Sequence, residues 1–184
     1  MLTCSDSRVP TELVFDQGFG DLFVVRVAGN VCDTHETASI EYGAGHLGTP
    51  MIVVLGHAEC GAVTAVAMKA ELSGSMPALV HGIQPAVDKA QAKNPDLTGK
   101  ALVPSAVREN VFQSMEDLLN NSQEIRELVK AGKVKLVGAQ YEIATGRIRF
   151  LGEHPGQAKL LAPPAGKPAA EASARTAGPA GSTH

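Results

Sequence analysis

Two short clusters of residues in this sequence carry side chains suited to metal binding and acid–base chemistry. Cys4, Asp6 and Arg8 lie close together near the start of the chain, and His57 and Cys60 directly follow the apolar run MIVVLG. Both clusters come at the ends of expected strands, and in open α/β sheets ligands bind beyond the carboxyl ends of the strands. We therefore expect the two clusters to meet in space.

Together, Cys4, His57 and Cys60 would offer two thiolates and one imidazole. Zinc accepts sulfur and nitrogen ligands in a tetrahedron, and His-x-x-Cys places two ligands on one tight turn while the third arrives from a neighbouring strand. Three protein ligands leave one corner for water, whose pKa the metal lowers from about 15.7 toward about 7. A closed structural site would need a fourth protein ligand instead. The pattern predicts one Zn²⁺ per chain.

Asp6 and Arg8 are the candidates for a role beside that metal. Asp6 is two residues from Cys4, close enough either to bind the metal or to accept a hydrogen bond from a metal-bound hydroxide. Arg8 is placed for a bidentate salt bridge that would hold the carboxylate off the metal, because a guanidinium matches both oxygens. The alternative is a surface ion pair worth only ~0–1 kcal/mol.

The remaining cysteine and histidines have plainer predicted roles. Cys32 has no spaced partner, and a lone cysteine is most often a small buried apolar residue. The other histidines are expected to be surface or capping residues; they are His35, His46, His81, His154 and His184.

The elements that must position the two clusters follow from the apolar pattern. Apolar runs over 22–27 and 51–55 predict buried strands, and 133–141 with 147–151 flank a turn, as is typical of a hairpin. A capping box formed by Asp33 and Glu36 predicts the start of a helix. The expected helices lie near 34–47, from 61 onward, near 77–93 and near 104–131 with a break around 120–121. Strands alternating with helices predict a three-layer α/β/α fold whose central sheet is mostly parallel, with an antiparallel edge strand.

Length and composition exclude several classes of protein. The 184 residues fit one domain of ordinary size, and 44% hydrophobic with 19% charged residues excludes a wholly disordered chain. No apolar run approaches the ~18–20 residues of a membrane span, and a net charge of −3 gives no footprint for nucleic acid or an anionic membrane. Three cysteines do not make a secreted disulfide framework, so a reduced compartment, by default the cytoplasm, is expected.

The two ends of the chain differ in composition. Residues 1–152 carry the strands, helices and zinc motifs, and we expect them to form one domain. Residues 153–184 are rich in Ala, Pro and Gly and poor in large apolar side chains, a composition that cannot offset the entropy cost of ordering, so a disordered tail is expected.

The motifs CSDSRV, FVVRVAGN, SIEYG, VVLGHAECGAV and VGAQYEIATGRIRFL, in this order from Cys4 to about residue 151, resemble the β-class carbonic anhydrases. The resemblance implies a zinc ion on Cys4, His57 and Cys60, a catalytic dyad of Asp6 and Arg8, and a homodimer or homotetramer. The implied reaction is the reversible hydration of carbon dioxide to bicarbonate and a proton, through a zinc-bound hydroxide that the dyad orients. Activity is then expected to rise with pH.

The sequence also departs from the family pattern. Family members usually carry an N-terminal arm and the start of the first strand ahead of the first motif, and both are expected to be missing here. Some bacterial members bind bicarbonate at a regulatory pocket of Trp, Arg and Tyr, for which Arg26 and Tyr141 are matches. The chain has no Trp, so this regulation is not expected.

Two alternative functions stay open at this point. Relatives within the superfamily hydrolyse carbon disulfide or carbonyl sulfide with the same fold and metal. A non-catalytic protein would instead use zinc to hold the fold together, with Asp6 as the fourth ligand.

Overall fold

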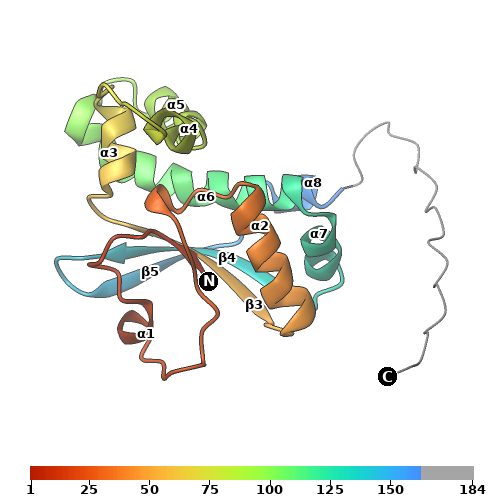
Figure 1. Ribbon diagram of the computed structural model, residues 1–184. Helices are drawn as coiled ribbons and strands as arrows, with labels where there is room; N and C mark the ends of the chain where they lie inside the picture. Colours follow the sequence, from red (N-terminus) through yellow and green to blue (C-terminus); the bar gives the residue numbers. More distant parts are fainter. Residues whose placement is uncertain (163–184) are drawn as a thin grey trace, which may run out of the picture.

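A computed structural model describes residues 1–162 as a five-stranded sheet with helices on both faces (Figure 1). The strands are β1 (Leu2–Thr3), β2 (Val25–Arg26), β3 (Met51–His57), β4 (Lys135–Glu142) and β5 (Arg147–Gly152), in the order β2-β1-β3-β4-β5. The first three pairs in that order are parallel, and β4 pairs with β5 in antiparallel fashion. The predicted fold class is confirmed.

The helices are α1 (Thr11–Val14), α2 (Thr34–Glu41), α3 (Gly61–Ala67), α4 (Met76–His81), α5 (Gln84–Lys93), α6 (Val103–Asn121), α7 (Gln123–Lys130) and α8 (Gln157–Leu160). Short 3₁₀ turns cover Ala28–Asn30 and Gly99–Leu102, and a π-helical turn, Tyr42–His46, extends α2. Figure 1 shows α6 running along one face of the sheet, with α3, α4 and α5 stacked on its far side and α1 on the opposite face of the sheet. Within residues 1–162, no helix is both long and apolar enough to cross a membrane.

Strand β3 shows why the central strands read as continuous apolar runs. Ile52 and Val54 join the core beneath α6, whereas Val53 and Leu55 join the core on the other face, beside Val14 of α1. Successive side chains of a strand point to opposite faces, so a strand covered on both faces is apolar throughout.

Helix α6 packs very close to the sheet because two strand positions lack a side chain. A Cβ placed on Gly56 would lie 2.6 Å from Cγ2 of Val111, and one placed on Gly138 would lie 2.8 Å from its Cγ1. Carbon atoms normally approach no closer than about 3.5 Å. Glycine at both positions therefore lets α6 pack closely against β3 and β4, next to the end of β3 that carries His57.

Local signals placed the starts of α2 and α7, whereas the helical pattern expected near 77–93 is divided into α4 and α5. The capping box of Asp33 and Glu36 is present at the start of α2. The expected break in the long helical pattern falls at Ser122, whose hydroxyl accepts a hydrogen bond from Ile125 N at 3.0 Å and caps α7.

One expected strand needs correction. The strand expected over 22–27 is reduced to Val25–Arg26, because β1 offers it only Leu2 and Thr3 as pairing partners. The domain was expected to end at residue 152; α8 follows that position, and Leu160 packs against the core beneath α6. The rest of the expected tail, 163–184, lies outside the described residues, and so does His184.

Candidate metal centre

Parallel pairing brings the two sequence clusters to one edge of the sheet. Strand β1 lies beside β3, with Leu2 opposite Val54 and Thr3 opposite Leu55, so Cys4 follows β1 at the level where His57 ends β3. A short turn then leads to Cys60, the residue before α3. The ligand atoms of Cys4, His57 and Cys60 all lie within 4.8 Å of one another, and all three residues are buried. The expectation that the two clusters meet is confirmed.

The two ring nitrogens of His57 have different surroundings: Nδ1 faces a backbone carbonyl, and Nε2 does not. Its Nδ1 lies 2.8 Å from the carbonyl oxygen of Ala58, which makes Nδ1 the N–H donor and leaves a lone pair on Nε2. Nε2 is buried and has no hydrogen-bond partner among residues 1–162. A metal ion is the kind of partner that such a nitrogen accepts, and the Ala58 carbonyl would fix the tautomer.

The two thiols cannot both ionise side by side without a cation. The hydrogen bond from the Cys60 thiol is the largest of the contacts that lower the pKa of Cys4, to about 4, and burial opposes it. The pKa of Cys60 is raised, because the Cys4 thiolate and burial both oppose a second negative charge. A divalent cation would compensate both thiolates, and two sulfurs with one imidazole form a donor set that suits zinc. The residues present therefore fit a zinc ion.

Asp6 lies beside this group of three and is held there by Arg8. The Asp6 carboxylate accepts hydrogen bonds from Arg8 Nε at 3.0 Å, from Arg8 Nη2 at 2.8 Å and from the Arg8 backbone N–H at 2.9 Å. Its Oδ2 is 3.9 Å from His57 Nε2. These hydrogen bonds from Arg8 hold the pKa of Asp6 well below its usual range. The carboxylate is thus ionised, close to the metal-ligand group and turned toward Arg8.

Sequence reasoning did not predict the roles of two residues that brace this segment. Arg26 donates from Nε to the Cys4 carbonyl at 3.0 Å and from Nη2 to the Asp6 carbonyl at 2.6 Å, so its guanidinium fixes the backbone on both sides of Ser5. Glu59 Oε2 lies 3.6 Å from Arg8 Nη1 in an exposed ion pair. The pairing of β1 with β2 places Arg26 opposite Thr3. The sequence does not reveal this contact, because it depends on the register of the two strands.

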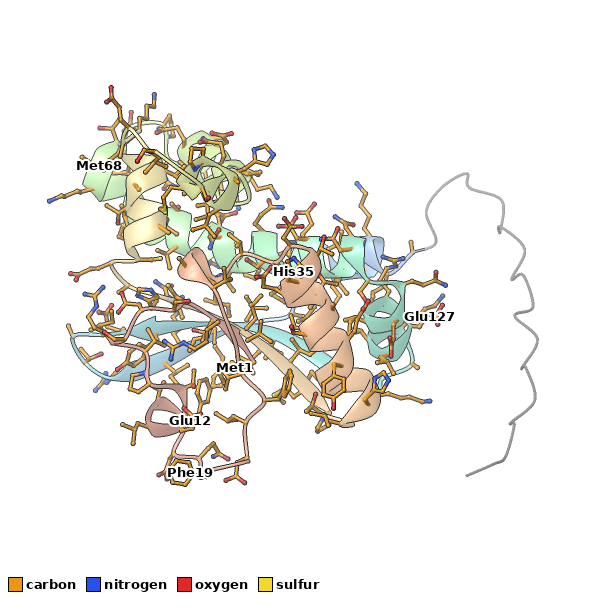
Figure 2. All side chains as sticks on the ribbon, viewed as in Figure 1. Met1, Glu12, Phe19, His35, Met68 and Glu127 are labelled. Atoms are coloured by element: carbon orange, nitrogen blue, oxygen red, sulfur yellow. The ribbon has the colours of Figure 1, made fainter. Side chains whose placement is uncertain are left out.

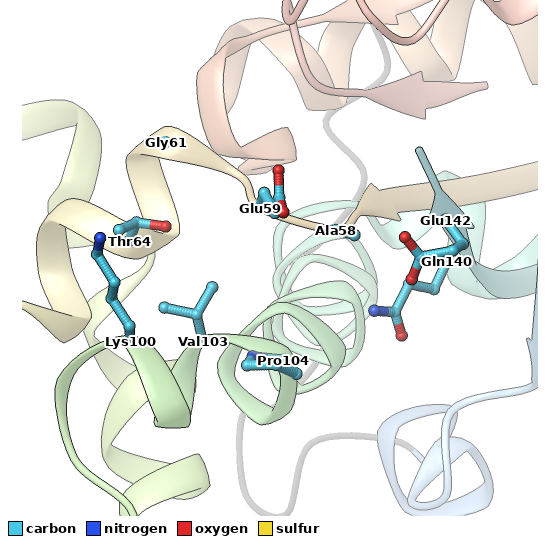
Figure 3. A pocket seen from close by; sticks show the side chains of 9 residues that line it. All are labelled: Ala58, Glu59, Gly61, Thr64, Lys100, Val103, Pro104, Gln140 and Glu142. Atoms are coloured by element: carbon cyan, nitrogen blue, oxygen red, sulfur yellow. The ribbon is translucent and has the colours of Figure 1, made fainter. Parts of the chain in front are cut away.

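A pocket of about 650 Å³ lies against the turn that carries the candidate ligands (Figure 3). Its walls come from that turn, from α3, from the start of α6 and from the end of β4. The lining residues include Glu59, Thr64, Lys100, Gln140 and Glu142. The candidate metal centre therefore sits beside an open cavity of mixed polar and apolar lining at the carboxyl edge of the sheet.

Comparisons with known proteins were made on sequence and on structure. Residues 1–148 match a protein-family model described as carbonic anhydrase. The chain is 38% identical over 149 residues to carbonic anhydrase 2 of Mycobacterium tuberculosis, an alignment that covers 78% of this chain and 69% of that protein.

Solved structures give the same result. A structure from a study of two tetrameric β-carbonic anhydrases of the ascomycete Sordaria macrospora is similar with a TM-score of 0.76 at 28% identity, covering 83% of this chain and 79% of that one. The β-carbonic anhydrase of Coccomyxa in complex with acetazolamide is similar with a TM-score of 0.73 at 27% identity, covering 82% and 69%.

Proposed function

This chain belongs to the β-class carbonic anhydrase family, and on that premise we propose that it hydrates carbon dioxide reversibly with one zinc ion held by Cys4, His57 and Cys60. The observation that carries the proposal is the buried group of two sulfurs and one unpaired imidazole nitrogen within 4.8 Å of one another. Bound there, zinc would supply the Lewis acidity that lets water act as a nucleophile near neutral pH.

The chain's own residues would orient and protect that chemistry. Asp6 is an ionised acceptor 3.9 Å from His57 Nε2, so it can accept a hydrogen bond from the attacking water and fix the direction of attack on carbon dioxide. Arg8 keeps this carboxylate ionised and turned aside, and Arg26 holds the backbone that carries it. Asp6 and Arg8 therefore act as a dyad that supports catalysis at the metal.

The grip of Arg8 on Asp6 also argues against a closed structural site. The candidate for a fourth protein ligand is Asp6, but both of its oxygens are engaged by Arg8. The group of ligand atoms in mutual reach contains Cys4, His57 and Cys60 without Asp6. Three protein ligands leave a position open, as catalytic zinc sites do.

Stopped-flow measurement of carbon dioxide hydration on protein of known zinc content tests the proposal. We expect one zinc per chain and activity in the wild type, loss of both in Cys60→Ser, and retained zinc with about a hundredfold lower activity in Asp6→Ala. Cys32→Ser is the matched control, because this buried thiol lies outside the group, and it should keep both zinc and activity.

Full zinc occupancy with no hydration activity would refute the catalytic proposal and leave the structural one. The same assay with carbonyl sulfide and carbon disulfide tests the alternative substrates: faster turnover of either one than of carbon dioxide would reassign the reaction. Acetazolamide, which is bound in the Coccomyxa relative, is expected to inhibit the wild-type activity.

We propose further that the chain assembles into a homodimer or homotetramer. Leu13, Phe19 and Phe150 are exposed by 60% or more, and all three lie on or near α1 and β5 (Figure 2 labels Phe19). Exposed apolar side chains of this size are the kind that a partner surface covers. Light scattering coupled to size-exclusion chromatography should give two or four chains per particle, and a monomer at micromolar concentration would contradict this assembly.

A further inference from the structure

The backbone of Gly29 connects a candidate metal ligand to the middle of helix α6. Its N–H donates a hydrogen bond to Cys4 Sγ at 3.3 Å, and its carbonyl oxygen accepts one from Asn110 Nδ2 at 2.7 Å. Both hydrogen bonds are buried, and Asn110 is 1% exposed. A side chain 81 residues away along the sequence therefore grips the residue whose amide faces the Cys4 sulfur.

The turn that presents this amide needs such a grip. Gly29 has φ +73° and Asn30 has φ +45°, so two consecutive residues occupy the left-handed region, which costs energy for a residue with a Cβ. A Cβ on Gly29 would also lie 2.6 Å from Cδ1 of Ile83, the residue before α5, so the turn packs closely against this side chain. A conformation of this kind persists when its surroundings fix it.

Two side chains of α6 supply that fixation from one helix face. Ser114 Oγ lies 2.8 Å from the Asn30 carbonyl oxygen, and Asn110 holds the Gly29 carbonyl. They are four residues apart, so they sit one above the other on the helix. Each of the two residues in the left-handed region thus has its carbonyl bound by α6.

The chemistry of Asn110 points beyond ordinary packing. Its Oδ1 is buried and has no hydrogen-bond partner within residues 1–162. A buried amide that leaves one polar atom unpaired lowers the stability of the fold. The amide therefore carries a cost to stability, and the hydrogen bond that its nitrogen makes is the one to the Gly29 carbonyl.

We propose that Asn110 and Ser114 are positioning residues for the metal centre, which hold the Gly29 N–H against Cys4 Sγ and so stabilise the thiolate that zinc requires. This inference rests on the proposed function, because it concerns the same site. Outer-shell partners that orient or tune metal ligands commonly change metal affinity about 10–100-fold when they are removed.

Zinc affinity, measured by competition with a chromophoric chelator, is the first test. Asn110→Ala should weaken zinc binding about tenfold and Ser114→Ala by less. Gln113→Ala is the matched control. Gln113 is a buried polar residue of the same helix, but its hydrogen bonds go to Lys89 and Asp117 and not to Gly29 or Asn30. The control should bind zinc within about twofold of the wild type, although its free energy of unfolding falls too.

Cobalt substitution gives a second reading that a merely structural role would not change. In Asn110→Ala the sulfur-to-cobalt charge-transfer band should move to lower energy, because a sulfur that loses its N–H donor gives up electron density more readily. The band of Gln113→Ala should stay in place.

Unchanged zinc affinity and an unmoved cobalt band in Asn110→Ala would overturn the inference, and so would an equal loss in Gln113→Ala. If Asn110→Ala does not fold, Ser114→Ala decides the matter by the same two readings, since it removes the second contact and leaves the first. A wild-type chain that binds neither zinc nor cobalt would instead refute the proposed function itself.

Discussion

Replacing Gly56 by alanine should push α6 away from β3, one residue before the candidate ligand His57. The new methyl carbon would lie 2.6 Å from Cγ2 of Val111, roughly 1 Å closer than carbon atoms normally approach. Overpacking of this size typically costs about 1–3 kcal/mol. Val111→Ala removes the obstructing groups but leaves a cavity, and two lost methyl groups at ~0.8 kcal/mol each plus the cavity cost amount to about 2–3 kcal/mol.

The two changes should compensate each other when combined. In the double variant the alanine methyl at position 56 occupies space that the Val111 side chain vacated, so the expected loss is about 2–3 kcal/mol rather than the sum of roughly 3–6 kcal/mol. Urea unfolding of all four proteins at a fixed free zinc concentration measures the coupling.

A control cycle pairs Gly56→Ala with Ile125→Val. Ile125 is fully buried in α7 and belongs to the same core, but it is not among the atoms nearest a Cβ at position 56. These two changes should add within about 0.5 kcal/mol. Additive behaviour in the Val111 cycle as well would refute the close-approach explanation for Gly56.

Three further predictions concern titratable groups. Hydration activity should rise between about pH 6.5 and 8.5 as water at the metal becomes easier to ionise, since the pKa of Asp6 is held well below its usual range and Asp6 does not titrate there; a flat profile would contradict this. Burial raises the pKa of Cys32 to about 12, so after zinc removal at pH 8 iodoacetamide should alkylate Cys4 before Cys32, as peptide mass spectrometry would show, and the reverse order would contradict it. Burial also raises the pKa of Asp117 to about 6, above its unfolded value, so the folded state binds the extra proton and wild-type stability falls as pH rises toward 6. Asp117→Asn should therefore increase the free energy of unfolding at pH 7 by on the order of 1 kcal/mol, allowing for solvent screening, with the gain vanishing near pH 4 in denaturant titrations.

Elements with local signals could be predicted from the sequence. The start of α2 follows from the capping box of Asp33 and Glu36, and the hairpin follows from two apolar runs around a Thr-Gly turn. Both signals act within a few residues. The four-residue helix α1 was not predicted, because it is too short to show a helical period, and β2 was predicted too long because its length depends on its partner β1.

The same distinction applies to the candidate site. Cys4, His57 and Cys60 could be grouped in advance because they come at or soon after the ends of strands and their side-chain types share one chemistry. Asn110 could not be included, since it lies on a helix whose pattern signals an apolar stripe and its partner Gly29 is distant in sequence. Contacts of this second kind depend on where α6 lies in three dimensions.

Zinc K-edge X-ray absorption of the purified wild-type protein tests the central claim most directly. The account predicts one zinc per chain, with two sulfur scatterers, one imidazole and one further light-atom ligand, and with one sulfur fewer in any zinc that Cys60→Ser retains. Folded protein that takes up no zinc, or zinc without two sulfur neighbours, would contradict it.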